Sequence, residues 1–107
     1  MISDSLLQFI LTHTKRVTAE EKEGIHSKEI EKMAGVAGTV VRDAVKHLRR
    51  QGHPIVATSK GYRYAKDRKD LDMLITDMRG RAYSMLKTVS CLEENYKKAE
   101  YVQSSLF

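Results

Sequence analysis

The chain has 107 residues, of which 41% are hydrophobic and 31% charged, and its formal net charge is +5. A chain of this length buries only a small core, so we expect one domain with at most one appended element. No apolar run approaches the roughly eighteen residues of a membrane-spanning helix, and the N-terminus is too polar for a signal peptide. The single cysteine, Cys91, cannot form an internal disulfide, which favours a cytoplasmic location.

An amphipathic helix is predicted at the start of the chain, beginning near Ser3 or Asp4. Its apolar face has the spacing i, i+1, i+4, i+5 and consists of Leu6, Leu7, Ile10 and Leu11. Residues 14–24 are polar and charged, and Thr18 and Glu21 have the spacing of a capping box with no strong apolar run after it. We interpret this segment as a frayed continuation of the helix or as a loop.

A second helix is predicted over residues 28–34, after a strand of one or two residues at Ile25. Ser27 is expected to cap this helix at its N-terminus, and Gly35 is expected to end it in the left-handed conformation. The spacing of the apolar residues gives the helix an inner face of Ile30, Met33 and Ala34.

A third helix follows after a short turn, capped by Ala37 or Thr39, and it ends at Gly52 because Pro54 prevents continuation. Its inward positions are Val41, Ala44, Val45 and Leu48. Its outward positions are Thr39, Arg42, Asp43, Lys46, His47, Arg49 and Arg50. Two short helices joined by a tight glycine-containing turn, the second of them basic on its free face, are typical of a helix-turn-helix.

A β-hairpin is predicted next, with strands over residues 55–58 and 62–65 joined by Ser59, Lys60 and Gly61. Tyr62 and Tyr64 lie on one face of the second strand, and Arg63 lies on the other. The hairpin and the helix-turn-helix together predict a winged helix-turn-helix over residues 1–66. The fold class is therefore mainly α with a small β-wing.

A long C-terminal helix is predicted over residues 67–100, because apolar residues recur there with a heptad-like spacing. The pattern has one stutter beside Gly80 and ends at Ala99. A domain of this size cannot cover the whole apolar stripe. We therefore expect part of the stripe to pack against the same helix of a second copy. The residues assigned to this homodimer contact are Leu71, Leu74, Met78, Ala82, Met85, Val89, Leu92 and Tyr96. Residues 101–107 are expected to be an extended or frayed tail.

Basic residues are concentrated between Arg42 and Lys69. This segment contains nine basic and two acidic residues, a net charge of +7 that exceeds the +5 of the whole chain. Such a concentration on a helix and a hairpin indicates a surface for a polyphosphate partner, and we expect double-stranded DNA. The alternative interpretation is a solvated cationic face that has no ligand.

In a DNA complex the third helix would enter the major groove. The side chains placed to reach base edges are Thr39, Arg42, Asp43 and Lys46, of which Asp43 would accept from a cytosine amino group or orient Arg42. The side chains placed to reach phosphates are Ser27, Lys28, Arg49 and Arg50. Lys60 and Arg63 on the hairpin would contact the DNA backbone or the minor groove.

Three stretches, IHSKEIEKMAGV, VVRDAVKHLRRQGHPI and SKGYRY, resemble the N-terminal domain of the biotin operon repressor type. They resemble even more the small winged-helix proteins of phages and prophages of Gram-positive bacteria. The resemblance covers about residues 6–65 and implies DNA binding in a bacterial host cell, in transcriptional control or phage DNA replication. The family often opens its recognition helix with Ser-Arg, whereas this chain has Ala37 and Gly38. The ligase domain of the repressor has no counterpart here, so no enzymatic activity is implied.

The last five residues, QSSLF, are similar to the peptide by which bacterial replication and repair proteins hold the sliding clamp. A glutamine would bond to the pocket rim, and a Leu-Phe pair would fill the pocket. Gln103, Leu106 and Phe107 are the expected contacts, and the alternative is a terminal pair that packs on the C-terminal helix or stays free. An alternative function follows, in which the protein is an interaction module that binds a host replication component.

No catalytic or metal site is expected. The four histidines lie on different predicted elements, and no pair has the spacing of metal ligands. The sequence contains no recognisable nucleophile-base motif, carboxylate pair or glycine-rich phosphate loop, and we predict neither an enzyme nor a cofactor.

Overall fold

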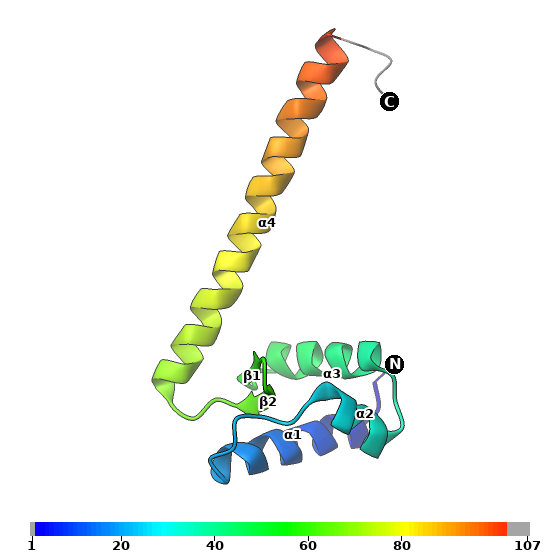
Figure 1. Ribbon diagram of the computed structural model, residues 1–107, viewed down its shortest axis with the longest axis vertical. Coiled ribbons are helices and arrows are strands. Elements are labelled where there is room, and N and C mark those ends of the chain that lie inside the picture. Colours follow the sequence, from blue (N-terminus) through cyan, green and yellow to red (C-terminus); the bar gives the residue numbers. More distant parts are fainter. Residues whose placement is uncertain (1, 103–107) are drawn as a thin grey trace. The chain divides into compact units, whose positions relative to one another are not determined.

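The computed structural model of the protein describes the backbone of residues 2–102 and the side chains up to residue 98 (Figure 1). Its elements in chain order are α1 (Asp4–Ala19), α2 (Ser27–Ala34), α3 (Gly38–Arg50), β1 (Ile55–Thr58), β2 (Gly61–Tyr64) and α4 (Arg68–Val102). This arrangement confirms the expected fold class, a winged helix-turn-helix followed by a long helix. The chain divides into two compact units, and the first extends to Leu74 rather than to residue 66.

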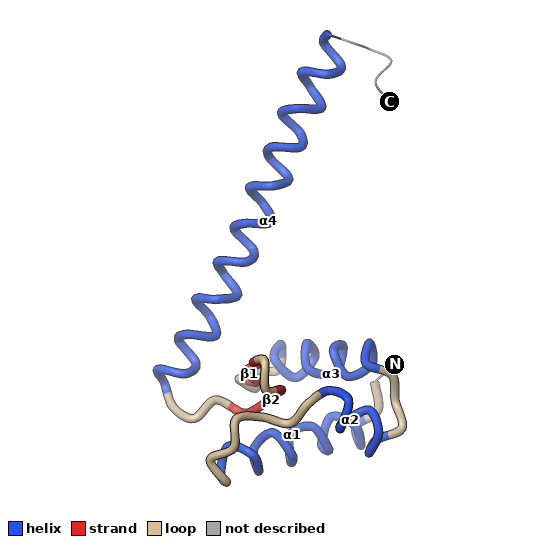
Figure 2. The backbone as a smooth tube through the Cα atoms, viewed as in Figure 1, coloured by secondary structure: helices blue, strands red, loops and turns tan. Residues whose placement is uncertain are grey.

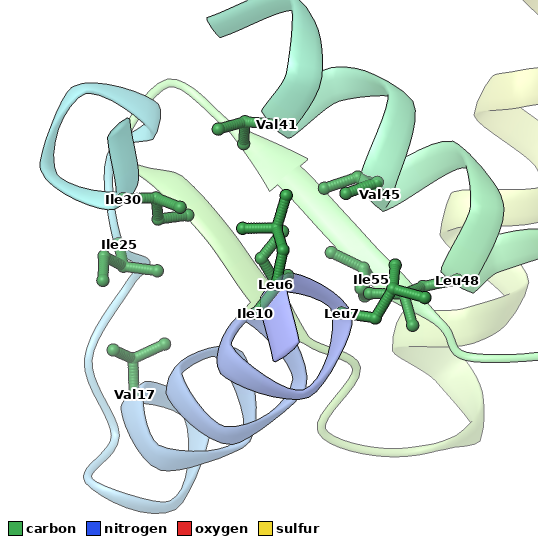
Figure 3. Packing of buried hydrophobic residues seen from close by; sticks show 11 residues of the cluster. Leu6, Leu7, Ile10, Val17, Ile25, Ile30, Val41, Val45, Leu48 and Ile55 are labelled. Atoms are coloured by element: carbon green, nitrogen blue, oxygen red, sulfur yellow. The ribbon is translucent and has the colours of Figure 1, made fainter. Parts of the chain in front are cut away.

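The core of the first unit is formed by one face each of α1, α2 and α3 together with Ile25 and with Ile55 of β1 (Figure 3). The predicted inner face of α3 is confirmed, since all four of its residues are at most 2% exposed. The prediction for Met33 on α2 is wrong, because this side chain is 48% exposed. α2 is only eight residues long, and Ile30 is its one fully buried side chain.

Helix α1 is longer than predicted. It begins as expected, with the Ser3 hydroxyl accepting a hydrogen bond from the N–H of Leu6 at 3.2 Å. The interpretation of residues 14–24 as frayed or looped is wrong up to Ala19. Thr14 is fully buried and donates to the carbonyl of Ile10 at 2.7 Å, so its hydroxyl is satisfied inside the helix. Val17, one turn on, is also buried.

The hydroxyl of Thr18 joins α1 to the hairpin, and it does not form the predicted capping box with Glu21. It donates to the carbonyl of Tyr64 at 2.6 Å and accepts from the N–H of Tyr64 at 3.0 Å. One side chain thereby satisfies both backbone polar groups at the end of β2.

The hairpin follows α3, and Figure 2 draws its two strands in red. The strands are antiparallel, with Ile55 opposite Tyr64 and Thr58 opposite Gly61. β2 is one residue earlier than predicted. The predicted short strand at Ile25 is confirmed, since its N–H and carbonyl both bond to Tyr62 at 2.8 Å. This third strand approaches so closely that a Cβ on Gly24 would lie 2.8 Å from the carbonyl carbon of Gly61. A side chain on Gly61 would likewise collide with the backbone of Ile25 and His26.

The N-terminal cap of α2 differs from the prediction, whereas Ala37 is one of the two residues predicted to cap α3. His26, not Ser27, occupies the N-cap position of α2, and Ser27 is inside the helix and donates to Glu31 at 2.9 Å. Ala37 precedes α3 and gives no side-chain cap. Gly35 has the predicted left-handed conformation, with φ of 68°. The turn between the two helices is therefore the tight one that a helix-turn-helix requires.

Helix α4 begins after Asp67, whose carboxylate accepts from the N–H of Asp70 at 2.8 Å. Its backbone continues through Tyr101 and Val102, so the prediction that these two residues are extended or frayed is wrong. The expected clamp-binding peptide spans residues 103–107, so its predicted contacts Gln103, Leu106 and Phe107 lie outside the described residues.

Candidate nucleic-acid interface

The outer face of α3 is a polar and basic surface opposite the core. The helix buries the four inner residues named above, and this fixes the direction of the others. The exposed residues are Thr39, Arg42, Asp43, Lys46, His47 and Arg50. All four residues that the sequence assigned to base edges are in this set, and so is Arg50 from the phosphate-contacting group.

A shallow hollow of about 500 Å³ lies along the C-terminal half of this face. It is lined by Ile2, Asp43, Lys46, His47 and Arg50. Two cationic side chains therefore flank one carboxylate and one imidazole, all from consecutive turns of α3. Sequence reasoning placed His47 on the outer face but gave it no role, and it did not anticipate Ile2. The place of His47 in this hollow could have been predicted, because residues four apart on a helix, such as Asp43 and His47, are neighbours on its surface.

The N-terminal end of α3 carries an acidic neighbour. A Cβ on Gly38 would lie 3.1 Å from Oε2 of Glu31, so this carboxylate packs over the first turn of the helix. A negative charge is stabilised there by the helix dipole. The Glu31 carboxylate thus lies at a helix N-terminus, a position at which phosphate groups bind in many proteins. Ser27, assigned to phosphates from the sequence, is half-buried and bonded to this same carboxylate, whereas Lys28 is exposed.

Arg49 has a structural contact at the other end of α3. Its side chain is half-buried, and its Nε donates to the carbonyl of Ile55 at 2.8 Å. This bond ties the last turn of α3 to the first residue of the wing. The structure thus separates Arg49, which the sequence grouped with phosphate contacts, from the exposed Arg50.

Arg63 on β2 is paired with Asp70 at the start of α4, within the first unit. Both guanidinium nitrogens Nη1 and Nη2 donate to the Asp70 carboxylate, the second at 2.9 Å. The side chains are only 15% and 10% exposed. The sequence assigned Arg63 to DNA, and the structure instead directs it at a carboxylate four residues beyond the predicted domain boundary.

This pairing perturbs both groups. The hydrogen bonds from Arg63 hold the pKa of Asp70 at about 2, against 3.8 ordinarily, with a further contribution from the N–H of Lys66. Burial opposes this effect without reversing it. The bond to Asp70 also raises the pKa of Arg63. The pair is therefore ionised throughout the physiological range and fixes the wing to the first turn of α4.

The wing tip has mixed charge. Lys60 at the tip is exposed. A cleft of about 550 Å³ separates the tip from the loop after α1, and it is lined by acidic and basic side chains alike. Its lining residues are Glu21, Lys22, Glu23, Thr58, Ser59, Lys60, Arg63 and Lys66. Exposed basic residues therefore continue from α3 through the wing, where acidic side chains lie among them.

The predicted dimer residues fall into two groups. Leu74 is buried in the first unit, at 8% exposure, and Leu71 is half-buried. From Met78 onward the assigned residues are all exposed in the single chain, with Met78 at 42% and Leu92 at 66%. Only this second group is available to another molecule.

Within the part of the chain that the structure describes, no three histidine, cysteine or acidic residues gather as they would around a metal ion. None of the described helices combines the length and apolar character needed to cross a membrane. Comparisons with protein-family models, curated proteins and solved structures find no match to this chain.

Proposed function

We propose that this protein binds double-stranded DNA through the outer face of α3 and acts as a homodimer joined by α4. The observation that carries the proposal is the exposure of Arg42, Lys46 and Arg50 on the second helix of a helix-turn-helix. A helix in this position enters the major groove in proteins of this architecture. The resemblance to phage and prophage winged-helix proteins supports a role in transcriptional control or phage DNA replication.

The exposed residues have different proposed roles. Arg42 and Lys46 contact guanine edges, Thr39 contacts a neighbouring base, and Asp43 accepts from cytosine or orients Arg42. Arg50, Lys28 and Lys60 contact phosphates, and these contacts give most of the affinity. Arg49 bonds to the carbonyl of Ile55 in β1, and Arg63 pairs with Asp70. These two arginines therefore have structural roles and are not assigned to DNA.

The test is duplex binding by fluorescence anisotropy between 50 and 200 mM salt. We expect affinity to fall steeply with salt, because counterions are released from the phosphates. Arg42→Ala and Lys46→Ala should each weaken binding to a preferred sequence by about 1–3 kcal/mol. Lys87→Ala removes the same charge from an exposed position of α4 and serves as the control. Absent binding, or binding that is flat with salt, would refute the proposal.

A further inference from the structure

Along the exposed part of α4, apolar residues follow an unbroken heptad pattern when the count starts at Ile75 instead of Leu74. The sequence pattern passed through Leu74 and needed a stutter near Gly80. Leu74 is buried in the first unit, whereas Ile75, the first residue of the second, is 40% exposed. Counted from Ile75, apolar residues recur with strict 3-4 spacing. They are Ile75, Met78, Ala82, Met85, Val89, Leu92 and Tyr96.

We propose that α4 pairs with α4 of a second copy in antiparallel orientation, with Met85 of each chain facing the partner's Val89. This rests on the dimerisation proposed above but not on DNA binding. The described side chains of α4 from Ile75 to Lys98 are all exposed in the single chain, and an apolar seam of this length requires a partner to cover it. The residues flanking the seam decide the direction of that partner helix.

Arg79, Leu86 and Glu93 occupy one flanking position in three successive heptads. In an antiparallel pair this position faces its own equivalent on the partner. With Met85 opposite the partner's Val89, Leu86 meets the partner's Leu86 at the two-fold axis. Arg79 then meets the partner's Glu93, and the symmetry repeats this ion pair at the other end. The flanking set is therefore complementary to itself.

The intrachain ion pairs of α4 leave these two charges available. Arg81 pairs with Asp77 at 3.0 Å, and Lys98 pairs with Glu94 at 4.0 Å. For Arg79 and Glu93, no ion pair is found among the described residues of their own chain. Leu86 is an apolar residue outside the seam, and it is 66% exposed in the single chain. Contact with the partner's Leu86 would bury it.

In a parallel pair, Arg79, Leu86 and Glu93 would not face complementary side chains. It would place Arg79 and Arg81 of both chains at one level, and it would set Leu86 beside the partner's Arg81. Glu93 would face the partner's Thr88. The seam would stack alanine on alanine at residue 82 and tyrosine on tyrosine at residue 96. Antiparallel pairing instead sets Ala82 against the partner's Leu92 and Met78 against the partner's Tyr96, which evens out the layer volumes.

The orientation has a consequence for the DNA-binding units. With 1.5 Å of rise per residue, the two Leu74 residues lie about 40 Å apart along the paired helices. The first units therefore join opposite ends of the coil. A parallel pair would join both units to the same end of the coil, with the two Leu74 residues about 10 Å apart.

Charge reversal tests the pairing without DNA. Arg79→Glu and Glu93→Arg should each weaken dimerisation about tenfold, measured by sedimentation equilibrium, because two ion pairs become two repulsions. The double variant should restore the wild-type constant to within about threefold. Lys87→Glu reverses an outward-facing charge and should change dimerisation little. A monomer or tetramer in the wild type, or failure of the double variant to restore pairing, would overturn the proposal.

Orientation is read directly from a spin label at Thr76 in a Cys91→Ser background. An antiparallel dimer places the two labelled positions about 33 Å apart along the axis, at 1.5 Å per residue. A parallel dimer places them below about 20 Å, since paired helices lie 8–10 Å apart. The short distance would refute the antiparallel arrangement. DNA binding is measured separately, so its failure and the failure of this pairing are distinguishable.

Discussion

The Asp70 carboxylate accepts hydrogen bonds from two guanidinium nitrogens of Arg63 and from the N–H of Lys66. It is the site where β2, the connecting residues 65–67 and α4 meet within the first unit. Since the folded state holds its pKa at about 2, against 3.8 ordinarily, its ionised form stabilises the fold. The stabilisation is fully present above about pH 4 and is lost as the pH falls through about 2.

We expect Asp70→Asn to lower the free energy of unfolding at pH 7 by about 2–3 kcal/mol, because it removes the charge that pairs with a largely buried arginine. It should also flatten the fall in stability between pH 4 and 2. Urea unfolding across this range measures both effects. Asp72→Asn removes an acid whose pair with Arg68 is exposed, and it should cost no more than about 1 kcal/mol. Equal losses in the two variants would contradict the assignment.

Both the backbone conformation and the close packing at position 61 require glycine. Its φ is +112°, and a Cβ would collide with the backbone of Ile25 and His26. Gly52 has a similar φ of +100° but open space around it. Gly52→Ala should therefore cost about 1–3 kcal/mol from backbone strain alone. Gly61→Ala should cost clearly more, since the third strand must also move away. Thermal unfolding of both variants compares the two costs, and similar values would argue against the close approach.

At the scale of elements, Thr18 is a polar link between α1 and β2. We expect Thr18→Val to destabilise the protein by about 1–3 kcal/mol, because both backbone groups of Tyr64 lose their side-chain partner while the shape is kept. Thr12→Val on the same helix is the control, since Thr12 is exposed and its hydroxyl accepts a long hydrogen bond of 3.4 Å from the exposed Gln8. Hydrogen exchange at the amide of Tyr64 should accelerate in the first variant only.

Sequence periodicity predicted the elements that a single apolar face defines. The four inner residues of α3 are an example, because burial on one side of a regular helix leaves a readable 3.6-residue period. The end of α1 could not be read this way. Thr14 looks polar in the sequence, and only its bond to Ile10 shows why it is buried. Thr18 had the spacing of a cap, but its partner is 46 residues away, on β2.

The candidate site was predictable to the same extent. Outward-facing residues such as Arg42 and Lys46 follow from the inner face of their own helix. Arg63 also lies on the strand face opposite the tyrosines, but its partner Asp70 belongs to the next helix. Nothing in the hairpin pattern reveals that pairing. The Glu31 carboxylate over Gly38 was equally hidden, since it depends on how two helices meet across the turn.

At the scale of the whole molecule, dimerisation through α4 should strengthen DNA binding by the first unit, because two copies then bind one duplex together. We expect Leu92→Glu to abolish dimerisation, because it places a charge in the apolar seam. Duplex affinity should then fall by at least about 100-fold, because the second unit no longer binds intramolecularly. The slope of log affinity against log salt should fall by about half, as half the phosphate contacts are lost.

Ser90→Glu is the matched control for this variant. It adds the same charge at an exposed position that faces away from the seam, so it should leave both dimerisation and the salt slope near the wild-type values. Anisotropy titrations between 50 and 200 mM salt, with sedimentation on the same samples, separate the two effects. If the monomeric Leu92→Glu protein bound DNA with the wild-type affinity and slope, one copy would suffice for binding. The role of α4 would then lie outside DNA recognition.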